Sequence, residues 1–457
     1  MFKSTNNDII LYENRVDSLK RKFSANKTFC SISLLVVFLC IIVYGSRLFY
    51  YYSKHKQKNS SEVVTLVEKV KQANKDNKNF GAISGNYYFI NDANNNYVKY
   101  SNIIWRIVKI NSNNSILLVA NESISDLAFG ENKKSFKESY IYEWLNKKNL
   151  DNTGILERNL TDVNNILTKQ NICKDSVNNL KKITCNKEEK NIYIGLLSVQ
   201  DYINVGADKS YLNNNSSFYL SNLNKENKVW YVADGKLSNS DGTDLYGVRP
   251  TILIRDGLNY ISGDGSEASP YTITNKNDLF GSFVTLGEDK WQIYDVNNEE
   301  VKMSLVGYVM NYDNTPFERD YSTIGYKYDK NEYNTLPYYL NNRYLSVRIN
   351  YGNILDECSW NNGYYGPENN YDYKNLYNSM VTAKIGLLSV TDVNLNKELN
   401  KYYMMSGYAE NSNLVYYRDE EGKLTTSISD EDNKIVPAVC INSSKLKLKE
   451  DGTYGVE

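Results

Sequence analysis

Histidine is almost absent from this chain of 457 residues, which contains only His55. A Ser-His-Asp triad and a Cys-His pair each need a histidine beside the nucleophile, so the sequence disfavours nucleophilic catalysis of these kinds. We therefore expect a protein that is not an enzyme. A cell-wall hydrolase stays as a less favoured alternative, because acidic residues are abundant and catalytic carboxylate pairs cannot be recognised from sequence spacing alone.

Cysteine is scarce as well, with six residues and no CxxC motif. The sequence thus lacks a zinc-ligand pattern, and short turns such as "DGTD" and "SGDGS" lack the spacing of an EF-hand. We predict no metal and no cofactor. Cys173 and Cys185 bracket the polar stretch "KDSVNNLKKIT". They are expected either to close a small surface loop by a disulfide or to remain free thiols.

An excess of charge of either sign is also missing, because 53 Lys and Arg face 54 Asp and Glu. This balance argues against nucleic acid as a partner. Tyrosine, by contrast, is abundant, with 41 residues. The Asn, Lys and Tyr bias is typical of a low-GC bacterial genome, although tyrosine on a surface also supplies rigid contact area for binding.

One long apolar run is present, the 19 uncharged residues of "TFCSISLLVVFLCIIVYGS" between Lys27 and Arg47. As a helix, this run would span a hydrocarbon core of about 30 Å. It predicts a transmembrane signal anchor over residues 28–52, with residues 1–27 in the cytoplasm and the bulk outside the cell. The expected location is the cell membrane, single-pass, with the bacterial membrane as a partner; a cleaved signal peptide is the alternative.

The next segment, residues 53–80, places Val63, Leu66, Val67 and Val70 at helical spacing. This pattern predicts a short juxtamembrane helix that serves as a stalk. From about Gly85, short alternating strands are separated by Asn, Asp, Ser and Gly, and "NSNN" is read as the turn of a hairpin. Helical patterns follow in "SFKESYIYEWLNKK" and "ERNLTDVNNILTKQ", so the predicted fold class is α+β.

The octapeptide "IGLLSVQD" at residues 194–201 returns as "IGLLSVTD" at residues 385–392. Other landmarks recur in the same order, 186 to 195 positions apart, including Trp105 with Trp291 and Pro250 with Pro437. This collinearity predicts a tandem duplication of whole domains, because solenoid repeats have periods of roughly 20 to 50 residues. The Gly- and Ser-rich seam near residue 272 separates a first domain, 81–272, from a second, 273–457.

The segments "IWRIV", "YIYEWLN", "IGLLSVQD", "VWYVADGKLS" and "YGVRPTILI" resemble an uncharacterised bacterial extracellular domain family. That family is similar to C-type-lectin-like folds and, more distantly, to formylglycine-generating enzymes and the variable proteins of diversity-generating retroelements. The resemblance implies two tandem C-type-lectin-like domains of α+β fold, so that, with the anchor predicted from the apolar run, the expected architecture is an N-terminal transmembrane helix followed by these two domains. Val436 replaces Arg249 in the second copy, so an ion pair formed by Arg249 would be missing there.

Aromatic residues in the Asn- and Tyr-rich stretches are the candidates for ligand recognition, because aromatic faces stack on sugar rings. They are Tyr219, Trp230, Tyr231, Tyr403, Tyr416 and Tyr417. Asp201 and Asp392 recur after "GLLSV" and are interpreted as helix N-terminal residues, with Ser198 and Ser389 as caps, rather than as catalytic acids.

These observations favour a membrane-anchored bacterial surface protein that presents two lectin-like domains for adhesion or ligand binding. The expected ligand is an extracellular glycan or protein. A structural subunit of a cell-envelope assembly, with envelope proteins as partners, is the alternative.

Overall fold

The computed structural model describes residues 42–47, 64–146, 159–214, 216–274, 278–322, 327–347, 349–367 and 379–456. The chain divides into two compact units, Met1–Val64 and Thr65–Glu457. All the sheets described below belong to the second unit.

The first unit is described at residues 42–47, which are helical, and at residue 64. Within the described part of the chain, no helix is long and apolar enough to cross a membrane. This finding contradicts the predicted transmembrane signal anchor and the predicted single-pass location. The remainder of the predicted span 28–52, and the predicted cytoplasmic segment 1–27, lie outside the described residues.

Helix α2 (Leu66–Ala73) opens the second unit and is held by a capping box. Thr65 Oγ1 accepts a hydrogen bond from Glu68 N at 3.2 Å, and the Glu68 carboxylate accepts one from Thr65 N at 2.9 Å. Leu66, Val67 and Val70 are buried in the main hydrophobic core. The helix expected from the apolar spacing is therefore present, but it packs against the sheets instead of forming a stalk. Residues 53–63 of that predicted stalk lie outside the described residues.

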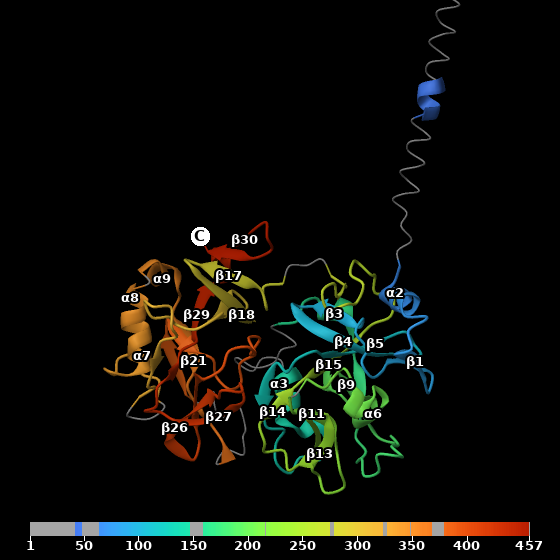
Figure 1. Cartoon of the computed structure of the whole chain (residues 1–457), viewed down its shortest axis with the longest axis horizontal. Coiled ribbons are helices and arrows are strands. Elements are labelled where there is room, and N and C mark those ends of the chain that lie inside the picture. The colour runs from blue at the N-terminus through green and yellow to red at the C-terminus, as the bar shows by residue number, and fades with distance from the viewer. Residues whose placement is uncertain are drawn as a thin grey trace, which may run out of the picture. The chain divides into compact units, whose positions relative to one another are not determined.

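Residues 80–272, which we call repeat 1, form a large, mainly antiparallel sheet (Figure 1). Its central order is β10-β15-β5-β4-β3-β16, in which only β16 and β3 run parallel. Two further strands, β2 and β1, extend from β4, and β7 pairs with β15. The strands are β1 (Phe80–Ile83), β2 (Asn86–Phe89), β3 (Tyr97–Tyr100), β4 (Ile103–Ile110), β5 (Ile116–Ala120), β7 (Leu167–Thr168), β10 (Ile194–Leu196), β15 (Pro250–Ile254) and β16 (Tyr271–Thr272).

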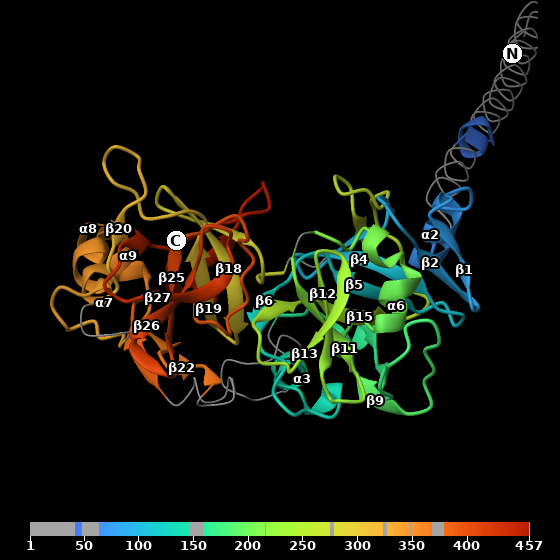
Figure 2. The ribbon, with the colours of Figure 1, turned by 60° about the horizontal axis from the view of Figure 1, so that its bottom comes forward.

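A second sheet of repeat 1 has the order β13-β12-β11-β14-β6, with β11 and β14 parallel. Its strands are β6 (Ser125–Leu127), β11 (Phe218–Leu223), β12 (Val229–Ala233), β13 (Lys236–Ser240) and β14 (Tyr246–Val248). The hairpin β8 (Gln170–Cys173) and β9 (Glu188–Ile192) stands beside it. Helix α6 (Val199–Asn204) lies against the large sheet (Figure 2). Its Val199 and Tyr202 belong to a separate hydrophobic cluster with Val108 and Val119 of that sheet.

Residues 278–456, which we call repeat 2, have the same strand order. Their large sheet runs β24-β29-β19-β18-β17-β31, again with one parallel pair, β17 and β31, and with β30 added at its end. These strands are β17 (Phe283–Leu286), β18 (Asp289–Asn297), β19 (Glu300–Leu305), β24 (Ile385–Leu387), β29 (Pro437–Asn442), β30 (Leu446–Leu448) and β31 (Tyr454–Val456).

The smaller sheet of repeat 2 runs β27-β26-β25-β28-β20, with β25 and β28 parallel and β22 beside β25. Its strands are β20 (Glu318–Arg319), β22 (Tyr364–Tyr365), β25 (Tyr402–Tyr408), β26 (Asn411–Arg418), β27 (Leu424–Ile428) and β28 (Asn433–Lys434). The hairpin β21 (Cys358–Asn361) and β23 (Met380–Ala383) corresponds to β8 and β9.

The repeated sequence landmarks occupy matching places in the two sets of strands. Trp105 lies on β4 and Trp291 on β18, while Pro250 and Pro437 begin β15 and β29. The two copies of the octapeptide begin the edge strands β10 and β24. The two repeats therefore share the same strand order, the same strand directions and the same positions of the repeated residues.

The described residues are mostly β-sheet, with 39% in strands and 15% in helices, which contradicts the predicted fold class of an α+β protein with an N-terminal transmembrane helix. The helices of repeat 1 are short: α3 (Tyr140–Asn146), α5 (Val163–Ile166), and the 3₁₀ turns η1 (Phe136–Glu138) and η2 (Ala207–Lys209). Repeat 2 has α7 (Leu336–Tyr338), the π-helical segment η3 (Tyr339–Tyr344), α8 (Leu345–Val347), α9 (Ile349–Ile354) and the 3₁₀ turn η6 (Ser443–Lys445). The helical pattern expected at 157–170 stops at Ile166 because Leu167 and Thr168 pair with β15.

Candidate functional site

The aromatic residues predicted to bind ligand fall on equivalent strands of the two smaller sheets. Tyr219 on β11 pairs with Tyr231 on β12, and Tyr403 on β25 pairs with Tyr417 on β26. Tyr219 and Tyr403 are fully buried. The Tyr219 hydroxyl donates to Asp244 O at 2.7 Å, and the Tyr403 hydroxyl lies 2.6 Å from Glu431 O. Both hydroxyls therefore bind backbone carbonyls within the protein, and neither aromatic ring is accessible to a ligand.

The neighbouring pair, Trp230 and Tyr416, is also committed to internal contacts. Trp230 Nε1 donates to Val177 O at 3.0 Å, and the buried Tyr416 hydroxyl donates to Tyr365 O at 3.2 Å. Tyr231 is half-buried and stacks on Tyr246, with ring centroids 4.3 Å apart. Tyr417 is half-buried. Because three of the six predicted residues are buried, the structure does not gather the set into one binding surface.

Asp201 occupies the helix position expected from the sequence. Ser198 is the N-cap of α6, and its Oγ accepts from Asp201 N at 3.0 Å. The Asp201 carboxylate also binds Lys109 Nζ at 2.7 Å and the Tyr88 hydroxyl at 2.8 Å. Burial raises the pKa of Asp201, but Lys109 and the hydrogen-bond donors outweigh it and hold this pKa below its usual range. The counterpart Asp392 accepts from Ser389 N at 2.7 Å in a turn instead of a helix.

Arg249 is buried at the end of the "GVRP" segment and binds carbonyl groups instead of a carboxylate. Its Nε donates to Ala120 O at 3.0 Å and its Nη1 to Leu212 O at 2.6 Å. The guanidinium carbon lies 4.7 Å from the centre of the Phe218 ring. Burial lowers the pKa of Arg249 to about 10. These contacts give Arg249 a structural role. Because they involve no carboxylate, the change to Val436 at the matching position of repeat 2 leaves no carboxylate there without a partner.

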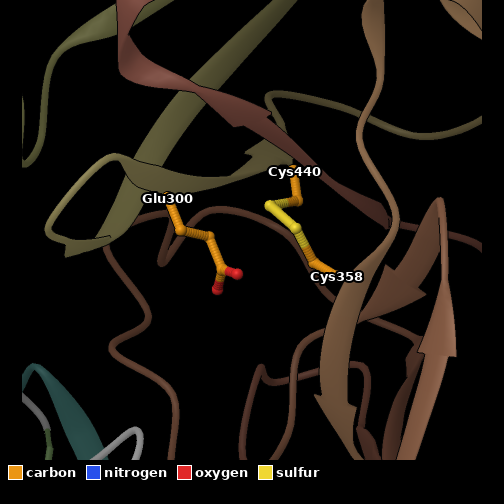
Figure 3. Close-up of side chains that lie close together, drawn as sticks. All are labelled: Glu300, Cys358 and Cys440. Carbon is orange, nitrogen blue, oxygen red and sulfur yellow. A yellow bond between two sulfur atoms is a disulfide. The ribbon is translucent and has the colours of Figure 1, made fainter.

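Two disulfides are present, one in each repeat. Cys173 and Cys185 are joined at a Cα separation of 5.7 Å, and Cys358 and Cys440 at 6.2 Å. Figure 3 shows the carboxylate of Glu300 beside the second bridge, and the three side chains have potential ligand atoms within 4.8 Å of one another. A metal binds the thiolate form of cysteine, which a disulfide lacks. This trio is therefore not a metal-binding set in the oxidised protein.

Repeat 1 and repeat 2 meet through β6, the octapeptide turn of repeat 2 and the strand β26. Asn394 N donates to Ile124 O at 2.9 Å, and Trp144 Nε1 donates to Thr391 O at 3.0 Å. Beside these bonds, Arg418 forms an ion pair with Asp126. The side chains of these two residues are only 4% and 18% exposed. The contact between the repeats therefore contains a buried charge pair.

A cavity of about 480 Å³ adjoins this contact and is lined by both repeats. Repeat 1 contributes Asn102, Ile103, Ile104, Asn121, Glu122, Ser123, Ile124 and Glu267, and repeat 2 contributes Phe283, Gln292, Val306, Asn394, Leu395, Asn396, Lys397 and Glu398. This size suits a small organic ligand, and sites of this kind combine apolar walls with a few polar groups. It is our candidate functional site.

Three of the residues that line this cavity carry a donor without a close acceptor: Ser123 Oγ, Asn396 Nδ2 and Lys397 Nζ. Asn396 Nδ2 is buried and has no hydrogen-bond partner in the described part of the chain. The half-buried Lys397 makes no hydrogen bond and no short ion pair with any described residue. Burial lowers the pKa of Lys397 to about 8; the carboxylates of Asp126 and Glu122 oppose this effect and Arg418 adds to it. A ligand with acceptor oxygens would satisfy these donors once their side chains turn toward the cavity.

Carboxylates supply the complementary chemistry. Glu122, Glu267 and Glu398 are exposed residues that line the same cavity. The Glu122 carboxylate already accepts from Asn214 Nδ2 at 2.7 Å. Ionised carboxylates only accept hydrogen bonds, so together they select ligand groups that donate. The apolar side chains of Ile103, Ile124 and Phe283 complete the lining, and the cavity can thus hold a molecule with both hydroxyl groups and apolar faces.

A second cavity, of about 450 Å³, lies near Asn102, Asp278 and Tyr454. Here the donor Asn102 Nδ2 is already bound to Phe280 O at 2.8 Å and to Asp278 O at 3.1 Å. The Thr161 hydroxyl is hydrogen-bonded to the Asp278 carboxylate. Because these polar groups are already paired with protein atoms, they are not available to hydrogen-bond a ligand, and we regard this cavity as the weaker candidate.

The residues of the candidate site were not singled out in the sequence analysis. One signal was available: after the octapeptide the sequence reads "YINV" in repeat 1 and "VNLNKE" in repeat 2, and only repeat 1 forms a helix here, α6, which begins within the octapeptide at Val199.

Comparisons with protein-family models, with curated proteins and with solved structures give no match for this chain.

Proposed function

We propose that the protein is a binding protein, without catalytic activity, that holds a small hydroxylated ligand of the saccharide class in the cavity between its repeats. The observation that carries this proposal is the pair of donors without close acceptors, Asn396 Nδ2 and Lys397 Nζ, in a cavity that also presents three carboxylates.

A saccharide fits this lining because each hydroxyl both donates and accepts a hydrogen bond. Its oxygen atoms would accept from Asn396 and Lys397, while its O–H groups would donate to Glu122 or Glu398. The carbon face of a sugar ring is apolar and matches the side chains of Ile124 and Phe283, which line the same cavity.

The position of the cavity also supports ligand binding. Its walls come from residues as far apart in sequence as Asn102 and Glu398. Binding pockets occur preferentially where two domains meet, because two surfaces together enclose a ligand better than one.

The test is calorimetric titration of the full chain with a panel of neutral and amino monosaccharides and disaccharides. Asn396→Ala is expected to weaken binding by roughly 3- to 10-fold, because one neutral hydrogen bond is lost. Lys397→Met is expected to weaken it by roughly 10- to 100-fold, because a charged donor is lost.

Asn164→Ala is the matched control, since Asn164 is an exposed asparagine on α5 that does not line the cavity. Its affinity should equal that of the unaltered protein. The proposal fails if no member of the panel binds at millimolar concentration, or if binding occurs and both cavity variants leave the affinity unchanged.

A further inference from the structure

Lys397 has the surroundings of a reactive amine. It lies in the segment 394–398 that follows the repeated octapeptide, and it is one of the residues that line the cavity between the repeats. The structure gives its Nζ no hydrogen bond and no short ion pair with a described residue. An amine that is not engaged by an acceptor keeps its lone pair available once the proton is lost.

We propose that Lys397 is a covalent attachment site, at which Nζ condenses with the aldehyde group of a ligand in the cavity to form an imine. The proposal rests on the binding function above, because the open-chain form of a reducing saccharide carries such an aldehyde. It narrows the expected ligands to compounds with a free carbonyl group. Hydrogen bonding alone does not distinguish such compounds from other hydroxylated molecules.

The reaction balances without an oxidant or a reductant. The neutral amine nitrogen forms a bond to the carbonyl carbon, and the carbonyl oxygen takes up a proton to give a carbinolamine. The hydroxyl oxygen of the carbinolamine then takes up a proton from the solvent and leaves as water when the C–O bond breaks, and the nitrogen gives its one remaining proton back to the solvent. One amine and one aldehyde give one imine and one water.

The charges around Lys397 favour the neutral amine that this step requires. Burial is the largest effect and lowers the pKa of Lys397 to about 8, with a smaller contribution of the same sign from Arg418. The carboxylates of Asp126 and Glu122 act in the opposite direction. Exposed Lys423, by contrast, has its pKa raised by its hydrogen bond and ion pair with Glu421.

The proportion of neutral amine at pH 7 therefore differs strongly between these two lysines. With a pKa near 8, Lys397 is neutral in roughly a tenth of the molecules at pH 7, whereas the raised pKa of Lys423 leaves that lysine almost entirely protonated. Entry into the cavity will reduce this advantage, so we expect labelling of Lys397 to exceed that of Lys423 by at least about tenfold.

The experiment treats the full chain with glycolaldehyde and sodium cyanoborohydride at pH 7 and follows labelling at each lysine by peptide mass mapping. Glycolaldehyde is small enough to enter the cavity without specific saccharide contacts. The expected result is fastest labelling at Lys397 among the lysine side chains, with a pH midpoint near 8. Labelling of Lys397 no faster than that of Lys423 overturns the inference.

Two variants and a second ligand separate this inference from the proposed function. Lys397→Arg keeps the positive charge near Asp126 and should abolish the fast label, whereas Lys423→Arg should leave it unchanged. A methyl glycoside has no free aldehyde, so its calorimetric binding reports the cavity alone. Glycoside binding without fast labelling overturns only the imine, and fast labelling without any saccharide binding overturns only the saccharide proposal.

Discussion

Arg418 on β26 of repeat 2 forms a buried ion pair with Asp126 on β6 of repeat 1. The two residues are 292 positions apart in the sequence. Arg418 also donates from Nη1 to Gly422 O at 3.2 Å, so the guanidinium is held on its own strand pair as well. The stability of the contact between the repeats should therefore depend on the charge of Asp126.

The first prediction concerns Asp126→Asn. Removing this carboxylate leaves the buried guanidinium of Arg418 without its counter-ion, which typically costs about 3–5 kcal/mol of stability. We expect the free energy of unfolding to fall by that amount in urea denaturation followed by circular dichroism. The control is Asp76→Asn, because Asp76 is 88% exposed and its ion pair with Lys75 is 3.8 Å long. That change should stay within about 0.5 kcal/mol. A similar, small effect for both variants would contradict the importance of the buried pair.

The second prediction is a pH dependence at the same contact. Burial raises the pKa of Asp126, but Arg418 and Lys397 outweigh it, so the net pKa lies below the ordinary value of 3.8. A carboxyl group with a lowered folded-state pKa stabilises the protein above its unfolded pKa and loses this contribution as the pH falls through its folded pKa. The stability difference between the unaltered protein and Asp126→Asn should therefore be full above about pH 5 and shrink below about pH 4. An unchanged difference from pH 7 to pH 3 would disprove this linkage.

The third prediction ranks the two disulfides. The Cys173–Cys185 bridge spans 12 positions and the Cys358–Cys440 bridge spans 82. In the chain-entropy model, the longer loop restricts the unfolded chain more, which gives about 3 kcal/mol for the first bridge and about 4–5 kcal/mol for the second. Cys358 and Cys440 are also buried, so their replacement removes packing contacts.

The double variants Cys173→Ala with Cys185→Ala and Cys358→Ala with Cys440→Ala test this order in urea denaturation under non-reducing conditions. The first pair should cost less free energy of unfolding than the second. Equal costs, or a larger cost for the surface loop, would show that loop length and burial do not govern the contribution of these bridges.

The duplication was predictable from the sequence because a copied domain keeps its landmarks in order. Trp105 and Trp291 occupy matching strands, and the turn at 111–114 joins β4 to β5 as its Asn-rich sequence indicated. Local helical signals were less reliable. Leu167 continues an apolar helical pattern, yet it pairs with Ile254 on β15, since pairing with a sheet can override a weak local propensity.

The candidate site was not predictable in the same way. Strand β11 is buried along its whole length, so sequence alternation does not tell which of its aromatic residues face a ligand and which face the core. Tyr219 was chosen for its aromatic ring and proved to be a core residue. The cavity, in turn, joins Asn102 of one repeat to Lys397 of the other, and no local pattern records a contact across nearly 300 positions.

The last prediction uses the octapeptide itself, in which Asp201 and Asp392 are matching residues with different surroundings. The Asp201 carboxylate binds Lys109 Nζ at 2.7 Å, with the two side chains 11% and 18% exposed. Asp201→Asn removes the charge that compensates Lys109, so we expect a loss of about 3 kcal/mol in the free energy of unfolding.

Asp392→Asn is the matched change in repeat 2, where the carboxylate accepts from the backbone N of Ser389 at 2.7 Å. An asparagine keeps an acceptor oxygen for this bond, so the expected loss is below about 1 kcal/mol. Urea denaturation is measured for both variants and for the double variant Lys109→Met with Asp201→Asn. The comparison separates the loss of the ion pair with Lys109 from the loss of the hydrogen bond between Asp201 and the N-cap residue Ser198. The combined variant should be more stable than Asp201→Asn alone, because the uncompensated ammonium is gone. If it is less stable, the ion pair does not dominate at Asp201, and the two copies of the octapeptide differ for another reason.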